Sequence, residues 1–254
     1  MPLFTDAPVS NIPDLSAYDS QVIDVASTEG IDLTRKLAAA QDDLAVELSV
    51  LLANLKLADQ PLWLTPSPNL ANVVVTKPLR LWHIYLSLEM VYRDAYNSEL
   101  NDRYAGKRDQ FHQLAECARE KLIQSGIGLV AEPVAEAATP QLITIPGALP
   151  DGSYFVTMAW VNAAGEEGAS AVPAAITTSG SSLQVQPPAA PEKATGWNVY
   201  IGSELDAMVL QNQSPIDVGT VWQQLTPLAT AGHRPGTGQN PTYLKPLPRV
   251  IQRG

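Results

Sequence analysis

The chain has 254 residues, a formal net charge of −10 and one cysteine, Cys117. This length suffices for two domains of ordinary size, and a single cysteine excludes an intramolecular disulfide. The net charge is −6 over residues 1–130 and −4 over residues 131–254, with Lys and Arg scattered among the acidic residues. This pattern argues against a protein that binds nucleic acid through a basic surface.

Residues 1–30 carry five acidic side chains, no Lys or Arg, and three prolines. This composition predicts an extended N-terminal arm. Its apolar residues, Phe4 among them, are too many for a purely solvating tail. We therefore expect the arm to lie across a neighbouring subunit or to pack on its own domain. The single cysteine suits a protein that matures in a reducing cytoplasm. The N-terminus lacks the basic and apolar segments of a signal peptide, so a soluble protein without one is expected.

A helical domain is predicted over residues 31–130. Apolar residues at helical spacing indicate helices over about 32–57, 76–100 and 102–125. The middle helix is apolar on two sides, which means that it needs two partners. Its aromatic residues are predicted to lie in the bundle core or at a contact between subunits of a ring: Trp82, Tyr85, Tyr92 and Tyr96.

A Pro- and Ala-rich linker is predicted over residues 131–146, and apolar residues alternate beyond it, as strands do. Seven short runs have the spacing of an antiparallel β-sandwich, predicted over 147–230: 141–145, 154–162, 174–178, 183–186, 196–201, 208–211 and 220–225. The predicted fold class is therefore α+β and multidomain, with about three long helices followed by a β-sandwich. Residues 231–254 are predicted to form a second extended arm, in which Tyr243 and Leu244 are candidate interface residues.

Two parts of the chain resemble proteins of tailed bacteriophages. The phrases SYFVTMAWVNAAGEEGAS (153–170), ATGWNVYIG (194–202) and LQN…PI…G…W (210–222) resemble immunoglobulin or fibronectin-III-like modules of phage virions. The stretch LRLWHIYLSLEMVYRDAYNSELNDRYAGKRDQFHQLAECARE (79–120) resembles the helical head–tail connector, or adaptor, proteins that form rings beneath the portal. Simple adaptors are a helical domain alone, so the added sandwich departs from that pattern.

The resemblance implies a structural virion protein that joins the portal to the tail at the neck and is assembled in the host cytoplasm. Its partners would be further copies of itself, expected as a dodecameric ring, with the portal and tail or neck proteins. Genomic DNA would pass through without specific binding, and no membrane is involved. The alternative is a tail or baseplate protein whose β-sandwich binds a host receptor or a carbohydrate.

No catalytic, metal or cofactor site is predicted, and the protein is not expected to be an enzyme. His83, His112 and His233 fall on two helices and a loop with no nucleophile motif nearby. Cys117 lies in an apolar helical stripe, which predicts a buried, inert thiol. The tryptophans Trp160, Trp197 and Trp222 could form a platform for sugar stacking, but strand alternation places the first two in the core.

Overall fold

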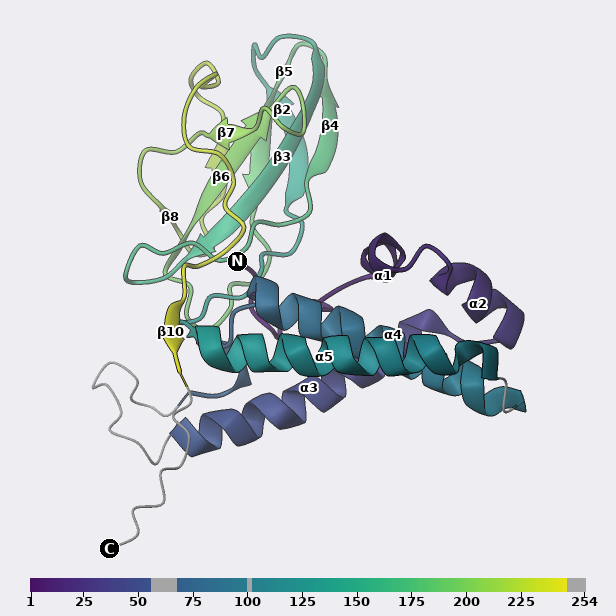
Figure 1. Ribbon diagram of the computed structural model, residues 1–254. Coiled ribbons are helices and arrows are strands. Elements are labelled where there is room, and N and C mark those ends of the chain that lie inside the picture. The colour runs from purple at the N-terminus through teal and green to yellow at the C-terminus, as the bar shows by residue number, and fades with distance from the viewer. Residues whose placement is uncertain (56–67, 100–101, 246–254) are drawn as a thin grey trace, which may run out of the picture. The chain divides into compact units, whose positions relative to one another are not determined.

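The computed structural model describes residues 1–55, 68–99 and 102–245, and the fold is α+β (Figure 1). Its α-helices lie in the N-terminal half and its antiparallel sheets mainly in the C-terminal half. The chain divides into two compact units. The helical unit is Ala7–Ala131 with the segment from Pro241 onward, and the β unit is Met1–Asp6 with Glu132–Asn240. The β unit is therefore inserted into the helical unit, not appended to it.

The described part of the helical unit holds five α-helices: α1 (Ile12–Tyr18), α2 (Val22–Glu29), α3 (Leu33–Leu55), α4 (Lys77–Glu99) and α5 (Ala105–Ser125). Two 3₁₀ turns, η2 (Leu70–Asn72) and η3 (Asp102–Tyr104), precede α4 and α5. The three long helices occur where the apolar spacing predicts them. The predicted ends at residues 57 and 100 lie outside the described residues.

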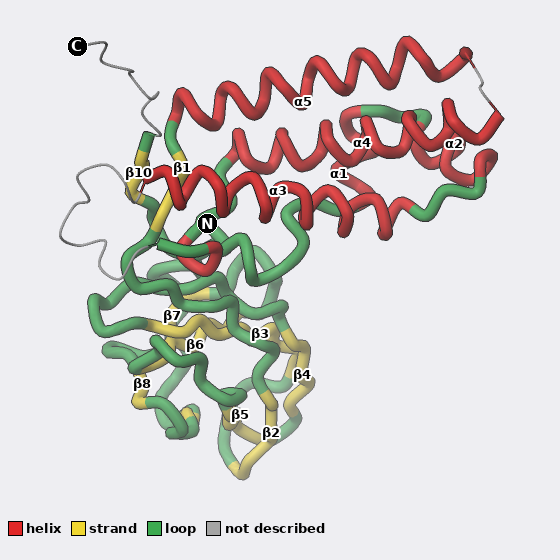
Figure 2. Tube along the Cα trace, turned by 90° about the horizontal axis from the view of Figure 1, so that it is seen from below, coloured by secondary structure: helices red, strands yellow, loops and turns green. Residues whose placement is uncertain are grey.

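Helix α4 is the centre of the helical unit. It contacts α1, α2, α3 and α5, and Figure 2 shows it lying between α3 and α5. Its buried residues Leu88, Val91 and Tyr92 share one core with Leu37 of α3 and Phe111 of α5. An apolar surface on two sides of α4 is therefore satisfied within its own chain.

The predicted extended arm over residues 1–30 is wrong for the part that forms α1 and α2. Asn11 begins α1 with a capping box: its side chain accepts from the N–H of Asp14, and the Asp14 carboxylate accepts from the N–H of Asn11. Pro13 stands in the first turn, where a missing N–H costs no helical hydrogen bond. The prolines of residues 1–30 favour an extended segment when read from the sequence, but Pro13 marks the start of a helix.

A short antiparallel ladder joins β1 (Ile127–Leu129) to β10 (Thr242–Leu244) in the helical unit. Gly128 pairs with Tyr243 in this ladder. A Cβ atom at Gly128 would lie 2.8 Å from Cγ2 of Thr76 and 3.0 Å from Cβ of Pro241, so the packing requires glycine. The predicted extended C-terminal arm is therefore wrong for the residues of β10, because they pair with a strand far away in the sequence.

The β unit is built from two antiparallel sheets. One has the order β2-β5-β9, and the other has the order β4-β3-β6-β7 with β8 also paired to β6. The strands are β2 (Gln141–Pro146), β3 (Gly152–Val161), β4 (Ala174–Thr178), β5 (Ser181–Gln186), β6 (Gly196–Gly202), β7 (Val209–Leu210), β8 (Ile216–Asp217) and β9 (Trp222–Gln223). Each predicted strand has a counterpart. The first of them, over 141–145, corresponds to β2, which overlaps the end of the range predicted as a linker and pairs with β5.

The two sheets share one apolar core. Trp160 of β3 pairs with Trp197 of β6, and their side chains are 1% and 0% exposed. Leu183 and Val185 of β5 pack into the same cluster from the other sheet. The alternation of apolar residues therefore works as predicted, with one set of side chains from each sheet turned inward.

The first six residues belong to the β unit through specific hydrogen bonds. The Asp6 carboxylate accepts from the N–H of Leu3 at 2.8 Å and from the N–H of Glu136 at 3.0 Å. The Met1 ammonium donates to the carbonyl of Gln239 at 3.2 Å. Phe4 is buried here at 4% exposure. These hydrogen bonds hold residues 1–6 in the β unit. The chain passes from one unit to the other after Asp6, Ala131 and Asn240.

Two positions of α3 provide a matched test of the helical core. Leu44 is fully buried, whereas Asp43 is exposed on the same helix. We expect Leu44→Ala to lower the free energy of unfolding by about 2–5 kcal/mol through lost burial and a cavity. Asp43→Ala should change it by less than about 0.5 kcal/mol. Urea unfolding followed by circular dichroism measures both, and equal losses would contradict the assigned face of α3.

Candidate functional site

The residues predicted for the core or for a subunit contact lie in three separate places. On α4, Trp82 and Tyr92 are buried, while Tyr85 and Tyr96 are half-buried. Phe4 is buried and belongs to the β unit. Tyr243 and Leu244 lie in β10, and only Tyr243, at 48% exposure, presents a large free surface. The aromatic residues of α4 therefore serve mainly the core of their own unit.

The buried carboxylate of Asp19 joins α4, α5 and the turn after α1 through a hydrogen bond and an ion pair to the partly exposed Lys107. The Tyr92 hydroxyl donates to Oδ2 of Asp19 at 2.5 Å, and Nζ of Lys107 lies 3.3 Å from Oδ1 of the same carboxylate. The Tyr92 ring stacks on Phe111, and Lys107 lies over the Phe111 ring at 5.4 Å. Burial, followed by the bond to Asp19, raises the pKa of Tyr92, so this tyrosine acts as a structural donor.

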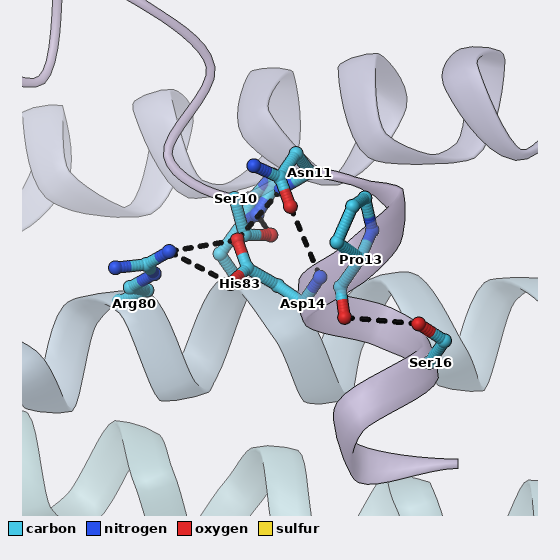
Figure 3. Close-up of polar contacts among 7 residues, drawn as sticks. All are labelled: Ser10, Asn11, Pro13, Asp14, Ser16, Arg80 and His83. Carbon is cyan, nitrogen blue, oxygen red and sulfur yellow. Dashed lines mark hydrogen bonds and ion pairs between the residues drawn. The ribbon is translucent and has the colours of Figure 1, made fainter. Parts of the chain in front are cut away.

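His83 anchors the segment before α1 to α3 and α4. Its side chain is fully buried, with Nδ1 lying 2.6 Å from Oγ of Ser10 and Nε2 lying 3.0 Å from the carbonyl oxygen of Leu37. Because a carbonyl can only accept, Nε2 carries the proton, and Nδ1 accepts from the Ser10 hydroxyl. Figure 3 shows this contact beside the Asp14–Arg80 pair, whose closest atoms lie 2.7 Å apart. Burial lowers the pKa of His83.

Gln239 joins three segments of the β unit. Its side-chain oxygen accepts from the N–H of Val134 at 2.7 Å. Its amide nitrogen donates to the carbonyl of Glu132 at 2.9 Å and to Oε2 of Glu166 at 2.8 Å. The side chain of Asn162 donates to the same two acceptors at 3.1 Å. Two amide side chains thereby hold the turn after β3 to the incoming and outgoing chain.

Glu167 follows β3 and is half-buried, and its carboxylate holds side chains of β6. Its Oε1 accepts from the Tyr200 hydroxyl at 2.5 Å and from the side chain of Asn198. Asn198 in turn accepts from Asn212 at 2.6 Å. Burial first, and then this bond to Glu167, raises the pKa of Tyr200. Glu166 and Glu167 of this turn therefore each accept hydrogen bonds from side chains of the β unit.

The described residues contain no group of three or more His, Cys, Asp or Glu side chains that could hold a metal ion. Cys117 is exposed, so the predicted burial of this thiol is wrong. Its neighbour Ala118, one residue further round α5, is the position that faces the core. Since Trp160 and Trp197 are both buried, the platform of three tryptophans for sugar stacking is excluded.

Outside β10, the described residues of the helical unit expose large apolar side chains in two places. The α3 patch consists of Val46 and Val50, at 66% and 54% exposure, with Ala53 one turn further on. The α1–α2 patch consists of Tyr18 at the end of α1 and Ile23 in α2, at 46% and 50% exposure. A contiguous apolar surface of this kind is typical of protein–protein contacts. These two patches are candidate surfaces for contact with other chains.

No protein-family model matches the chain, and a search of curated proteins gives no significant match. Among the described residues, no helix combines the length and the apolar character that crossing a membrane requires.

We expect Gln239→Ala to destabilise the β unit by about 1–3 kcal/mol, because it leaves the buried N–H of Val134 without its acceptor. Gln223→Ala is the matched control, since Gln223 is exposed and bonds only to the Gln184 side chain and through its backbone. Thermal unfolding of both variants measures the difference. A Gln239 variant as stable as the control would refute the anchoring role.

We expect the protein to lose stability in acid through His83. The pKa of His83 is lowered in the folded state, so the unfolded state binds more protons, and stability is full above about pH 6.5 and is lost as the pH falls toward the folded pKa. Urea unfolding at about pH 8 and pH 5 should show that the advantage of the wild type over His83→Gln shrinks at the lower pH. An advantage that stays constant or grows would contradict the neutral, buried imidazole.

Proposed function

We propose that this protein is a non-enzymatic structural component of a tailed-phage virion, a ring-forming connector of the neck between portal and tail. The observation that carries the proposal is the pair of exposed apolar patches on the helical unit. Among the described residues, the core of that unit does not use them, because α4 packs against α1, α2, α3 and α5. The α3 patch and the α1–α2 patch are therefore available to other subunits.

Two different patches on one unit suit a ring. A closed ring of identical subunits uses a heterologous contact, in which one surface of each subunit meets a different surface of the next. In the proposed ring, Val46 and Val50 of one copy pack against Tyr18 and Ile23 of its neighbour. A two-fold dimer would need only one self-complementary patch. We propose twelve subunits, a number that rests on the resemblance to connector proteins alone.

The strand order of the β unit supports the proposed immunoglobulin or fibronectin-III-like character. In such folds strands C and F pair in one sheet and strands B and E pair in the other. If β2, β3, β5 and β6 are taken as B, C, E and F, both pairings are present. Strand β4 then stands beside C, and β7 beside F. Strand β9 departs from the pattern, since it follows the last of these strands in sequence and pairs with β5.

The charge distribution suits a channel for DNA. The helical unit has 16 acidic and 14 basic residues, a net charge of −2, and the β unit has ten acidic and two basic residues, a net charge of −8. A surface with more acidic than basic groups repels the phosphate backbone. In the proposed ring, genomic DNA passes without binding, and the portal and tail proteins are the partners above and below.

The proposal is tested by the mass of the purified full-length protein in light scattering at several concentrations. We expect a discrete oligomer for the wild type. The double variant Val46→Glu and Val50→Glu should lower the assembly constant by about tenfold or more, because the contact would bury the added charges. The control is Gln110→Glu and Gln113→Glu, which adds the same charge to exposed positions of α5. An oligomer that survives the first pair of changes, or a wild type that stays monomeric, would contradict the proposed contact.

A further inference from the structure

The β unit contains a neutral, largely apolar cavity of about 720 Å³. Its wall is formed by the start of β3, the end of β6 and the segment after β9, with Leu149, Tyr154, Ile201 and Leu228 among its apolar residues. None of the residues that line it is charged or a histidine. An apolar cavity without charged groups selects an uncharged, apolar occupant.

The mouth of the cavity combines exposed leucines with acidic side chains. Leu225 lines the cavity and is 85% exposed, and Leu205 is 58% exposed in the turn between Ser203 and Ala207, which both line the cavity. Glu204 and Asp206 flank Leu205 and are exposed, and the structure gives their carboxylates no ion pair with any described residue. An apolar opening with an acidic edge is complementary to an apolar segment that carries cations beside it.

We propose that this cavity binds an extended peptide segment of a protein partner, with a large aliphatic side chain inserted between Leu149 and Leu228. Lys or Arg residues on either side of that side chain pair with Glu204 and Asp206. The inference does not rest on the ring assembly, because every group in it belongs to the β unit.

A sugar or a lipid headgroup fits this site less well than a peptide does. Sugar sites commonly use stacking aromatic rings and several polar groups that converge on the hydroxyls. Here Tyr154 is the one aromatic residue among those that line the cavity, and its hydroxyl already donates to the carbonyl of Pro150 at 3.0 Å. The acidic edge would repel an anionic headgroup. The exposed leucines outside the cavity match further contact with a polypeptide.

The test is selection of a displayed random nonapeptide library against the full-length protein, followed by affinity measurement with labelled peptides. We expect enriched sequences with one or two large aliphatic residues flanked by Lys or Arg and without Asp or Glu. Ala229→Trp fills the mouth, because Ala229 lines the cavity, is exposed, and bonds only through its backbone. It should weaken binding by about tenfold or more, the loss expected for an anchor side chain excluded from its pocket.

The matched control is Val172→Trp, which places the same side chain at a 68%-exposed position of the β unit outside the cavity wall and should leave affinity unchanged. Glu204→Lys with Asp206→Lys should weaken binding and reduce its dependence on salt. Unchanged thermal unfolding shows that each variant is folded. Failure to enrich any sequence, enrichment of acidic peptides, or peptides that bind Ala229→Trp as tightly as the wild type would overturn the proposal.

Discussion

The antiparallel ladder between β1 and β10 is the constraint on which the two-unit architecture depends. The chain leaves the helical unit just after β1 and returns just before β10, so the ends of the inserted β unit are held on adjacent strands. Insertion is tolerated when the two ends of the inserted unit lie close together. Gly128 makes the ladder possible, since a side chain there would collide with Thr76 and Pro241.

The helical unit satisfies its apolar surface around α4, which leaves its outer patches free for assembly. The buried imidazole of His83 and the buried carboxylate of Asp19 tie the segments around α1 to the same core. Buried polar groups stabilise a fold only when every donor and acceptor is paired. A single substitution leaves the remaining partner buried and unpaired, which costs free energy. The segment from Ser10 to Asp19 is thereby fixed to the helical unit.

Much of the fold could be predicted from periodicity, because the long helices and the strands each bury one regular face. The short helix α1 was missed although its start signal, Asn11 followed by Pro13 and Asp14, is local and readable. Pairing of β1 with β10 had no such signal, since three-residue strands more than 100 residues apart carry no pattern of their own. The side-chain bonds of Gln239 likewise depend on tertiary proximity. For the contact between subunits, the sequence predicts aromatic residues of α4. In the structure these residues serve mainly the core, whereas Val46 and Val50 are exposed.

Electron microscopy of the purified full-length protein tests the central claim most directly. The account predicts closed rings of one diameter, in which neighbouring helical units touch through the α3 patch and the α1–α2 patch. Rings whose only contacts run between β units, open filaments, or dispersed single copies at every concentration would contradict it.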